Sequence, residues 1–211
     1  MDIWEMVFDQ RRQLADILDT LDETQWNTPS LCSAWTVRDV VGHLVSFSEL
    51  GTPKAMLRML LNGFNFDNMN AKLAKDFGQR SSGELMGLMR KHTESRWTPP
   101  GLGPAAPLTD VVLHTADICR PLGIQGQLDA DKARAALDFL VSSKDKVVAN
   151  PACFAGLHLA PHNINWSWGE GPKVNGTASD IMVAIAGRHD ALEHLTGEGA
   201  DQLRARIATA R

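Results

Sequence analysis

Three polar side chains, Asp110, His114 and Asp117, interrupt an apolar stretch at residues 108–118 whose spacing is typical of a helix. Positions i, i+4 and i+7 share one face of a helix, and Val111 falls on the same side. We therefore expect the three polar groups to point into the core. Burying a carboxylate and an imidazole without partners is costly, and a metal ion is one common way to offset that cost.

A third candidate ligand, His43, lies on an earlier predicted helix at residues 37–50, three positions after Val40 on its apolar stripe. His43, Asp110 and His114 would form a set of two histidines and one carboxylate. With an open coordination position, that set suits a catalytic Zn(II) or Fe(II) ion. The alternative is that Asp110 and His114 form a hydrogen-bonded structural pair that needs no metal.

Asp117 lies one helical turn beyond His114 and has two candidate partners. It could accept a hydrogen bond from the second ring nitrogen of His114, as metal-bound imidazoles usually require. It could equally pair with Arg120, three residues further along the helix. The spacing alone leaves both alternatives open.

The three cysteines are odd in number and far apart, so they predict neither a disulfide framework nor a cysteine zinc motif. Cys119 lies about 140° round the helix from His114, off the ligand face. Cys32 precedes a predicted helix and has no neighbouring base. We expect ordinary thiols rather than nucleophiles or ligands.

Charge and composition exclude several classes of function. The chain has 211 residues, 44% of them hydrophobic, and a net charge of −4, which disfavours a nucleic-acid or anionic-membrane surface. No apolar run approaches the ~20 residues of a membrane span. The first residues lack the pattern of a signal peptide, and the scattered cysteines fit a reducing compartment, so we expect a cytoplasmic protein.

The hydrophobic pattern predicts two domains, a helical one at residues 1–148 and a small α+β one at residues 149–211. Thr36 and Asp39 have the spacing of a capping box at the start of the helix that carries His43. Residues 154–159 and 163–168 resemble two antiparallel strands. The remaining helices are expected at residues 52–61, 65–77, 81–97, 129–148, 179–187 and 201–211, beside one near the N-terminus.

Two segments carry a family resemblance: PSLCSAWTVRDVVGHL at residues 29–44 and HTADICRPLG at residues 114–123. Both are similar to signatures of the mycothiol-dependent maleylpyruvate isomerase family, which is related to DinB-like thiol-transferase bundles. The resemblance implies a mainly α fold, with a four-helix-type bundle bearing a divalent metal, usually zinc, and a small α+β C-terminal domain. It also implies that His43, Asp110 and His114 are the ligands. Asp110 stands where the family carries glutamate, so we expect it to reach the metal through one oxygen or through water.

The function implied by the resemblance is a transferase or isomerase reaction that uses a low-molecular-weight thiol, mycothiol. The metal would hold the thiol as thiolate, which would attack a small electrophilic molecule. The alternatives are a metal-dependent hydrolase and a non-catalytic ligand-binding protein on the same fold. Neither a nucleic acid nor a membrane is an expected partner. A homodimer through the bundle is compatible with the sequence, although no feature requires it.

Overall fold

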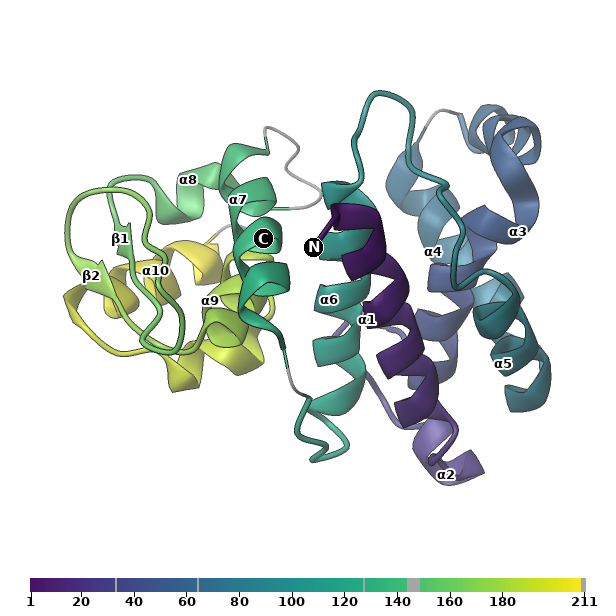
Figure 1. Ribbon diagram of the computed structural model, residues 1–211. Helices are drawn as coiled ribbons and strands as arrows, with labels where there is room; N and C mark the ends of the chain where they lie inside the picture. Colours follow the sequence, from purple (N-terminus) through teal and green to yellow (C-terminus); the bar gives the residue numbers. More distant parts are fainter. Residues whose placement is uncertain (33, 64, 127, 144–148, 210–211) are drawn as a thin grey trace. The chain divides into compact units, whose positions relative to one another are not determined.

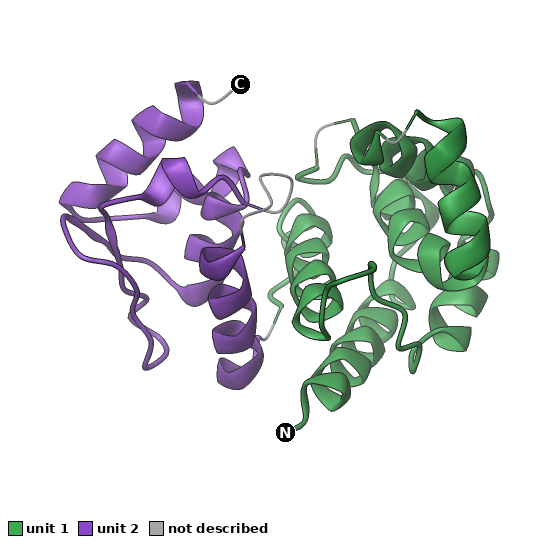
Figure 2. Ribbon diagram, turned by 90° about the horizontal axis from the view of Figure 1, so that it is seen from above, with its two compact units in different colours: residues 1–126 green, residues 127–211 purple. Residues whose placement is uncertain are grey.

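The structure, a computed structural model, describes residues 1–32, 34–63, 65–126, 128–143 and 149–209. The described chain is mainly α-helical, as the sequence predicts (Figure 1). It divides into two compact units, Met1–Gly126 and Gln127–Arg211, which Figure 2 shows in separate colours. No helix in the described ranges is long and apolar enough to cross a membrane.

The first unit is a helical bundle. Its helices are α1 (Ile3–Leu18), α2 (Glu23–Trp26), α3 (Val37–Leu61), α4 (Phe66–Gly78), α5 (Ser82–Lys91) and α6 (Ala105–Cys119). Helix α1 packs along α6, and α3 packs against α4, α5 and α6 (Figure 1). Leu14, Val40, Leu73 and Val111 are fully or almost fully buried between these helices. Burial of such apolar stripes is what holds a helical bundle together.

Helix α3 begins at the predicted capping box. The Thr36 hydroxyl accepts a hydrogen bond from the Asp39 amide, and the Asp39 carboxylate accepts one from the Thr36 amide. The helix is interrupted at Gly51, whose φ of 68° and ψ of 167° are open only to glycine. The structure therefore retains the two helical segments that the sequence predicts on either side of Gly51.

Helices α3 and α4 approach each other closely at Gly42. A Cβ atom at this position would lie 2.8 Å from the carbonyl oxygen of Ala74 and 2.8 Å from the amide nitrogen of Gly78. Only a glycine allows this approach, which places α4 beside the buried start of α3. Gly42 directly precedes His43, so the crossing also decides which α4 residues can reach that imidazole.

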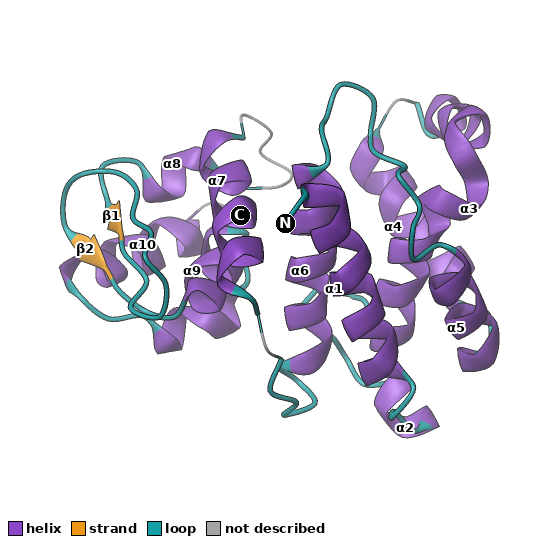
Figure 3. Ribbon diagram, in the orientation of Figure 1, coloured by secondary structure: helices purple, strands orange, loops and turns teal. Residues whose placement is uncertain are grey.

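The second unit combines short helices with a minimal sheet. It contains α7 (Ala130–Ser142), α8 (Pro151–Phe154), β1 (His158–Leu159), β2 (Lys173–Val174), α9 (Ala178–Ile185), the 3-10 helix η1 (His189–His194) and α10 (Glu198–Thr209). The two strands pair in parallel (Figure 3). Short helices beside a two-stranded sheet agree with the small α+β unit that the sequence predicts for the C-terminal part of the chain.

The expected antiparallel strand pair at residues 154–159 and 163–168 is wrong in its details. Phe154 ends helix α8, which Asn150 caps and which begins with a proline. A single antiparallel bridge joins Leu159 to Trp168, and the strand partner of residues 158–159 comes later in the chain. The cap overrides the apolar alternation that suggested a strand.

Helix α7 belongs to the second unit, where it packs against α9. The structural division therefore follows Gly126, whereas the sequence pattern placed the boundary after residue 148. An amphipathic helix does not reveal in its sequence which neighbour covers its apolar face, and this explains the difference. Residues 144–148 lie outside the described residues.

Candidate metal centre

The structure brings together the three residues that the sequence nominates as ligands, one from α3 and two from α6. The Nε2 atom of His43 lies 3.3 Å from Oδ1 of Asp110, and Nε2 of His114 lies 3.4 Å from the same oxygen. One ligand atom of each residue lies within 4.8 Å of the other two. The two histidine side chains are buried, whereas 44% of the Asp110 side chain is exposed. The cluster therefore opens to solvent on the side of Asp110.

Each imidazole is oriented by an oxygen at its other nitrogen. The Nδ1–H group of His43 donates to Oδ1 of Asn70 over 2.7 Å, and that of His114 donates to Oδ2 of Asp117 over 2.9 Å. In both rings Nε2 is thus the atom that faces Asp110. This is the arrangement by which proteins fix the tautomer of a metal-ligating histidine. Of the two partners considered for Asp117, the structure shows contact with His114.

Two pKa values reflect the close packing of these groups. Desolvation opposes ionisation of Asp110, but the charges and hydrogen bonds of His43 and His114 outweigh it and lower the pKa of that carboxyl. Burial disfavours the charged form of His114, yet hydrogen bonds to Asp110 and Asp117 raise its pKa well above the usual value. The carboxylates of Asp110 and Asp117, one at each ring nitrogen, are therefore the cause of the raised pKa of His114.

Two of the three separations between candidate ligand atoms match those of a tetrahedral site. With metal–ligand bonds of about 2.0–2.1 Å, ligand atoms in a tetrahedral site are about 3.3–3.4 Å apart, against about 2.9 Å for adjacent ligands of an octahedral one. The observed separations from Asp110 Oδ1 are 3.3 and 3.4 Å. The shorter aspartate side chain reaches the cluster through one oxygen, which suits monodentate binding. Three protein ligands of a tetrahedral ion would leave a fourth position open.

The loop before α3 contributes two side chains that the sequence pattern did not place at this site. Cys32 donates its thiol hydrogen to Oδ2 of Asp117 over 3.0 Å, and its sulfur lies 3.8 Å from Nδ1 of His114. The Trp35 ring lies against both histidines, with centroid separations of 5.3 Å to His43 and 6.2 Å to His114. The expectation that Cys32 lacks a neighbouring base is therefore wrong, because its contacts come from residues more than eighty positions away.

The other two cysteines do not contribute to the cluster. Cys119 is buried near the end of α6, and burial raises the pKa of its thiol to about 11. Cys153 is buried in the second unit, where burial likewise raises its thiol pKa. A raised pKa keeps a thiol protonated and unreactive at neutral pH. Both therefore behave as the ordinary thiols that the sequence predicts.

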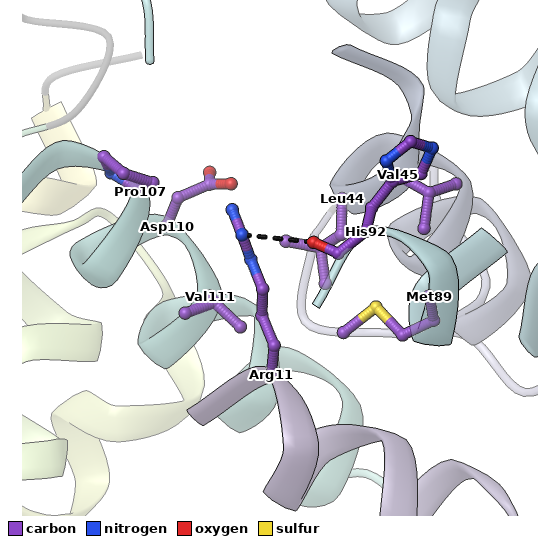
Figure 4. A pocket seen from close by; sticks show the side chains of 8 residues that line it. All are labelled: Arg11, Leu44, Val45, Met89, His92, Pro107, Asp110 and Val111. Carbon is purple, nitrogen blue, oxygen red and sulfur yellow. Dashed lines mark hydrogen bonds between the residues drawn. The ribbon is translucent and has the colours of Figure 1, made fainter. Parts of the chain in front are cut away.

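A small pocket in the first unit borders the exposed side of Asp110 (Figure 4). Its lining residues are Arg11, Leu44, Val45, Met89, His92, Pro107, Asp110 and Val111. Nη1 of Arg11 donates to the carbonyl oxygens of His92, Thr93 and Ser95, so the guanidinium group is held in place. Figure 4 shows its tip directed toward Asp110. The pocket thus combines apolar side chains with the guanidinium group of Arg11 and the carboxylate of Asp110.

Two aromatic rings continue from His43 on the side of Phe47. The His43 ring meets Phe47 edge-on at 6.1 Å, and Phe47 stacks on Trp97 at 4.8 Å. The indole N–H of Trp97 is buried and has no hydrogen-bond partner within the described ranges. A buried donor of this kind normally finds an acceptor.

Comparison with known proteins agrees with the fold and with the first of the two sequence signatures. Residues 7–58, which include Cys32 and His43, match the family model of the mycothiol maleylpyruvate isomerase N-terminal domain. Two solved structures resemble the chain over 94% of its length and 92% of theirs. One is a histidine-to-alanine variant of the mycothiol-dependent maleylpyruvate isomerase, at 14% identity and a TM-score of 0.59. The other is the mycothiol-dependent maleylpyruvate isomerase, at 12% identity and a TM-score of 0.56.

At this level of identity the structural likeness establishes the fold. No curated protein sequence matches the chain. The resemblance indicated by the sequence is confirmed for the N-terminal segment and for the mainly α architecture. The matched segment ends before Asp110 and His114, so these two residues stand on the geometry described above.

Proposed function

We propose that this chain, which shares its fold and N-terminal signature with mycothiol-dependent maleylpyruvate isomerase, is a divalent-metal-dependent enzyme that uses a low-molecular-weight thiol. The observation that carries the proposal is the convergence of two Nε2 atoms on Asp110 Oδ1, at 3.3 and 3.4 Å. Both rings thereby present to one carboxylate the nitrogen that is not bound to its orienting oxygen. Mycothiol is the thiol we propose, because the relatives are dependent on it.

Zn(II) is the proposed metal, held by His43, Asp110 and His114. Nitrogen and oxygen donors at tetrahedral spacing suit this ion, and three protein ligands with one open position are typical of its catalytic sites. When bound, such an ion lowers the pKa of a thiol in its open position, which makes a sulfur nucleophile available at neutral pH. Two neutral imidazoles and one carboxylate leave a net charge near +1, which favours an anionic sulfur ligand.

The residues around the centre would supply binding and orientation. Asn70 and Asp117 hold the two imidazoles with Nε2 toward Asp110, where the ion would be bound. Arg11 is fixed by three backbone carbonyls and directs its charge toward the pocket beside Asp110, where it would attract an acidic group of the electrophile. Leu44 and Met89 would exclude water from its apolar part. This arrangement supports two reactions. In the first, the thiol sulfur forms a bond to the electrophile while a leaving group departs with the thiol proton. In the second, the thiol sulfur adds to a double bond and later leaves again, so that the thiol is regenerated.

The first test is the metal content of untagged protein, measured by elemental analysis beside the variant His114→Ala. We expect about one equivalent of a divalent metal in the wild type and none in the variant. The control is His158→Ala, in the second unit, which should keep the metal. Absence of metal, with no uptake on titration, would reject the proposal and favour a non-catalytic protein.

The second test separates the thiol-dependent reaction from hydrolysis. Wild-type enzyme and His43→Ala are screened against small electrophiles with mycothiol, with another small thiol and without thiol. We expect turnover in the wild type only when thiol is present, and none in the variant. Turnover without thiol, lost in the same variant, would identify a metal-dependent hydrolase instead.

A further inference from the structure

We propose that Cys32 is a positioning residue for the metal centre, whose thiol holds Asp117 in the orientation that makes Nε2 of His114 a ligand. This inference rests on the metal centre proposed above. It assigns to a thiol in the loop before α3 a share of the metal affinity, although that thiol is not itself a ligand. Two sets of contacts support it, one made by the side chain and one by the loop that carries it.

The side-chain contacts converge on one oxygen. Oδ2 of Asp117 accepts the thiol hydrogen of Cys32 over 3.0 Å and the Nδ1–H of His114 over 2.9 Å. The Asp117 side chain is fully buried, so its carboxylate depends on protein donors for stabilisation. With two donors at one oxygen, the carboxylate cannot rotate without weakening both bonds. The orientation of the His114 ring is therefore coupled to the position of Cys32.

The loop that carries Cys32 is attached to the same residue through the main chain. The Leu31 amide donates to the backbone oxygen of Asp117 over 3.1 Å. Within the loop, the Ser30 amide donates to the carbonyl of Trp35 over 2.9 Å, and Ala34 has a φ of 70°, which is rare for a residue with a side chain. A strained, internally bonded turn of this kind presents its side chains in a defined direction.

The competing role for Cys32 is that of a ligand. Cys32, His114 and Asp117 also lie close enough to share an ion, which would be bound by Nδ1 of His114. That nitrogen already donates to Asp117, whereas Nε2 faces Asp110 and a second histidine. A metal at Nε2 keeps the bond from Nδ1 to Asp117, and a metal at Nδ1 breaks it. The geometry therefore favours a thiol that contacts Asp117 on the Nδ1 side of His114 and does not bind the metal.

The experiment uses Co(II) as the probe, because its absorption spectrum reports both affinity and ligand type. Metal-free wild type, Cys32→Ala and Cys32→Ser are titrated with Co(II), beside the matched control Cys119→Ala, which removes a buried thiol from the end of α6. We expect Cys32→Ala to weaken Co(II) binding about tenfold, at the lower end of the range for groups that orient a ligand. Serine retains a donor and should restore most of the affinity, while Cys119→Ala should bind like the wild type.

The wild-type spectrum should show no thiolate-to-cobalt charge-transfer band. The thermal midpoint of each metal-free variant is measured as well, because a purely structural role would lower it without changing the Co(II) affinity. Equal affinity in Cys32→Ala and wild type would overturn the inference, as would equal losses in the alanine and serine variants. A charge-transfer band that disappears in Cys32→Ala would make Cys32 a ligand instead. Failure of the wild type to bind Co(II) would reject the metal centre itself.

Discussion

The two units use histidine in different ways, although they contain similar numbers of them. In the first unit His43 and His114 are buried, and each has an oxygen at Nδ1 and a carboxylate before Nε2. In the second unit His162, His189 and His194 are exposed. His158 donates from Nδ1 to the carbonyl of Gly169, yet the described residues place it in no group able to hold a metal. Burial and an oxygen beside each ring nitrogen therefore distinguish the two candidate ligands from the histidines of the second unit.

The largest expected effect is the removal of one ligand from the first unit. His43→Ala should weaken Zn(II) binding by more than about 100-fold, because losing a ligand costs more than losing the group that orients it. His158→Ala, which removes an imidazole that donates to the carbonyl of Gly169 in the second unit, should leave the affinity unchanged. Isothermal titration of the metal-free proteins measures both. Equal affinities for the two variants would contradict the contrast between the units.

The next effect concerns the two groups that orient the imidazoles. Asp117→Asn should weaken metal binding about 10- to 100-fold, because a charged acceptor raises the basicity of His114 as well as fixing its ring. Asn70→Ala removes a neutral acceptor from His43 and should cost about tenfold or less. Competition with a coloured chelator ranks the two variants. If Asn70→Ala weakened metal binding more than Asp117→Asn, the hydrogen bond from His43 to Asn70 would matter more than the negative charge beside His114.

The candidate ligands could be predicted from the sequence, whereas the residues of other segments that contact His43 and His114 could not. Asp110, His114 and Asp117 lie on one helix, so their spacing already determines that they share a face. The capping box at Thr36 was equally readable and is confirmed. Cys32 and Asn70 reach the histidines through contacts between segments 27 or more positions apart, and periodicity carries no information about such pairs.

Contacts between distant segments also decide parts of the fold that the sequence pattern does not predict. Helix α5 was expected to continue to residue 97, but it ends at Lys91, and the carbonyls of His92, Thr93 and Ser95 accept hydrogen bonds from Arg11. A side chain on another helix thus stabilises the carbonyl groups beyond the end of α5. The assignment of α7 to the second unit has a similar cause, because the packing partner of the helix is decided by tertiary structure.

A third effect tests the close approach that positions α4. Gly42→Ala should lower the free energy of unfolding by about 2 kcal/mol, because a Cβ there meets backbone atoms that cannot rotate away. Gly87→Ala on α5 is the control, since a Cβ at that position has no neighbour within 4 Å and alanine favours a helix. Chemical denaturation measures both. A Gly42→Ala protein as stable as the control would show that α3 and α4 can separate without loss.

The smallest effect is expected at an ion-pair cluster beside the pocket. Glu49 contacts Lys91 at 2.8 Å and His92 at 2.6 Å, and these hydrogen bonds lower the pKa of the Glu49 carboxyl from 4.5 to about 2. A folded-state pKa below the unfolded one stabilises the protein above pH 4.5, and this stabilisation is lost as the pH falls toward 2. Because the cluster is partly exposed, Glu49→Gln should cost less than about 1 kcal/mol at pH 7.

The matched control for this cluster is Asp201→Asn, which removes an exposed partner of Arg204 in the second unit and should have no measurable effect. Urea denaturation at pH 7 and near pH 2.5 measures both variants. The difference between Glu49→Gln and wild type should shrink at the lower pH. A constant difference would show that packing, rather than charge, accounts for the contribution of Glu49.

Two of the proposed ligands, Asp110 and His114, belong to α6, together with Asp117, which orients His114. The third ligand, His43, comes from α3. An ion bound by all three ligands would therefore act as a removable cross-link between segments 67 residues apart. By mass action, free metal at 100 times its dissociation constant would add about 2.7 kcal/mol to the stability of the bundle. A chelator is accordingly expected to lower the melting temperature of the first unit, so that a heat scan becomes an assay for occupancy.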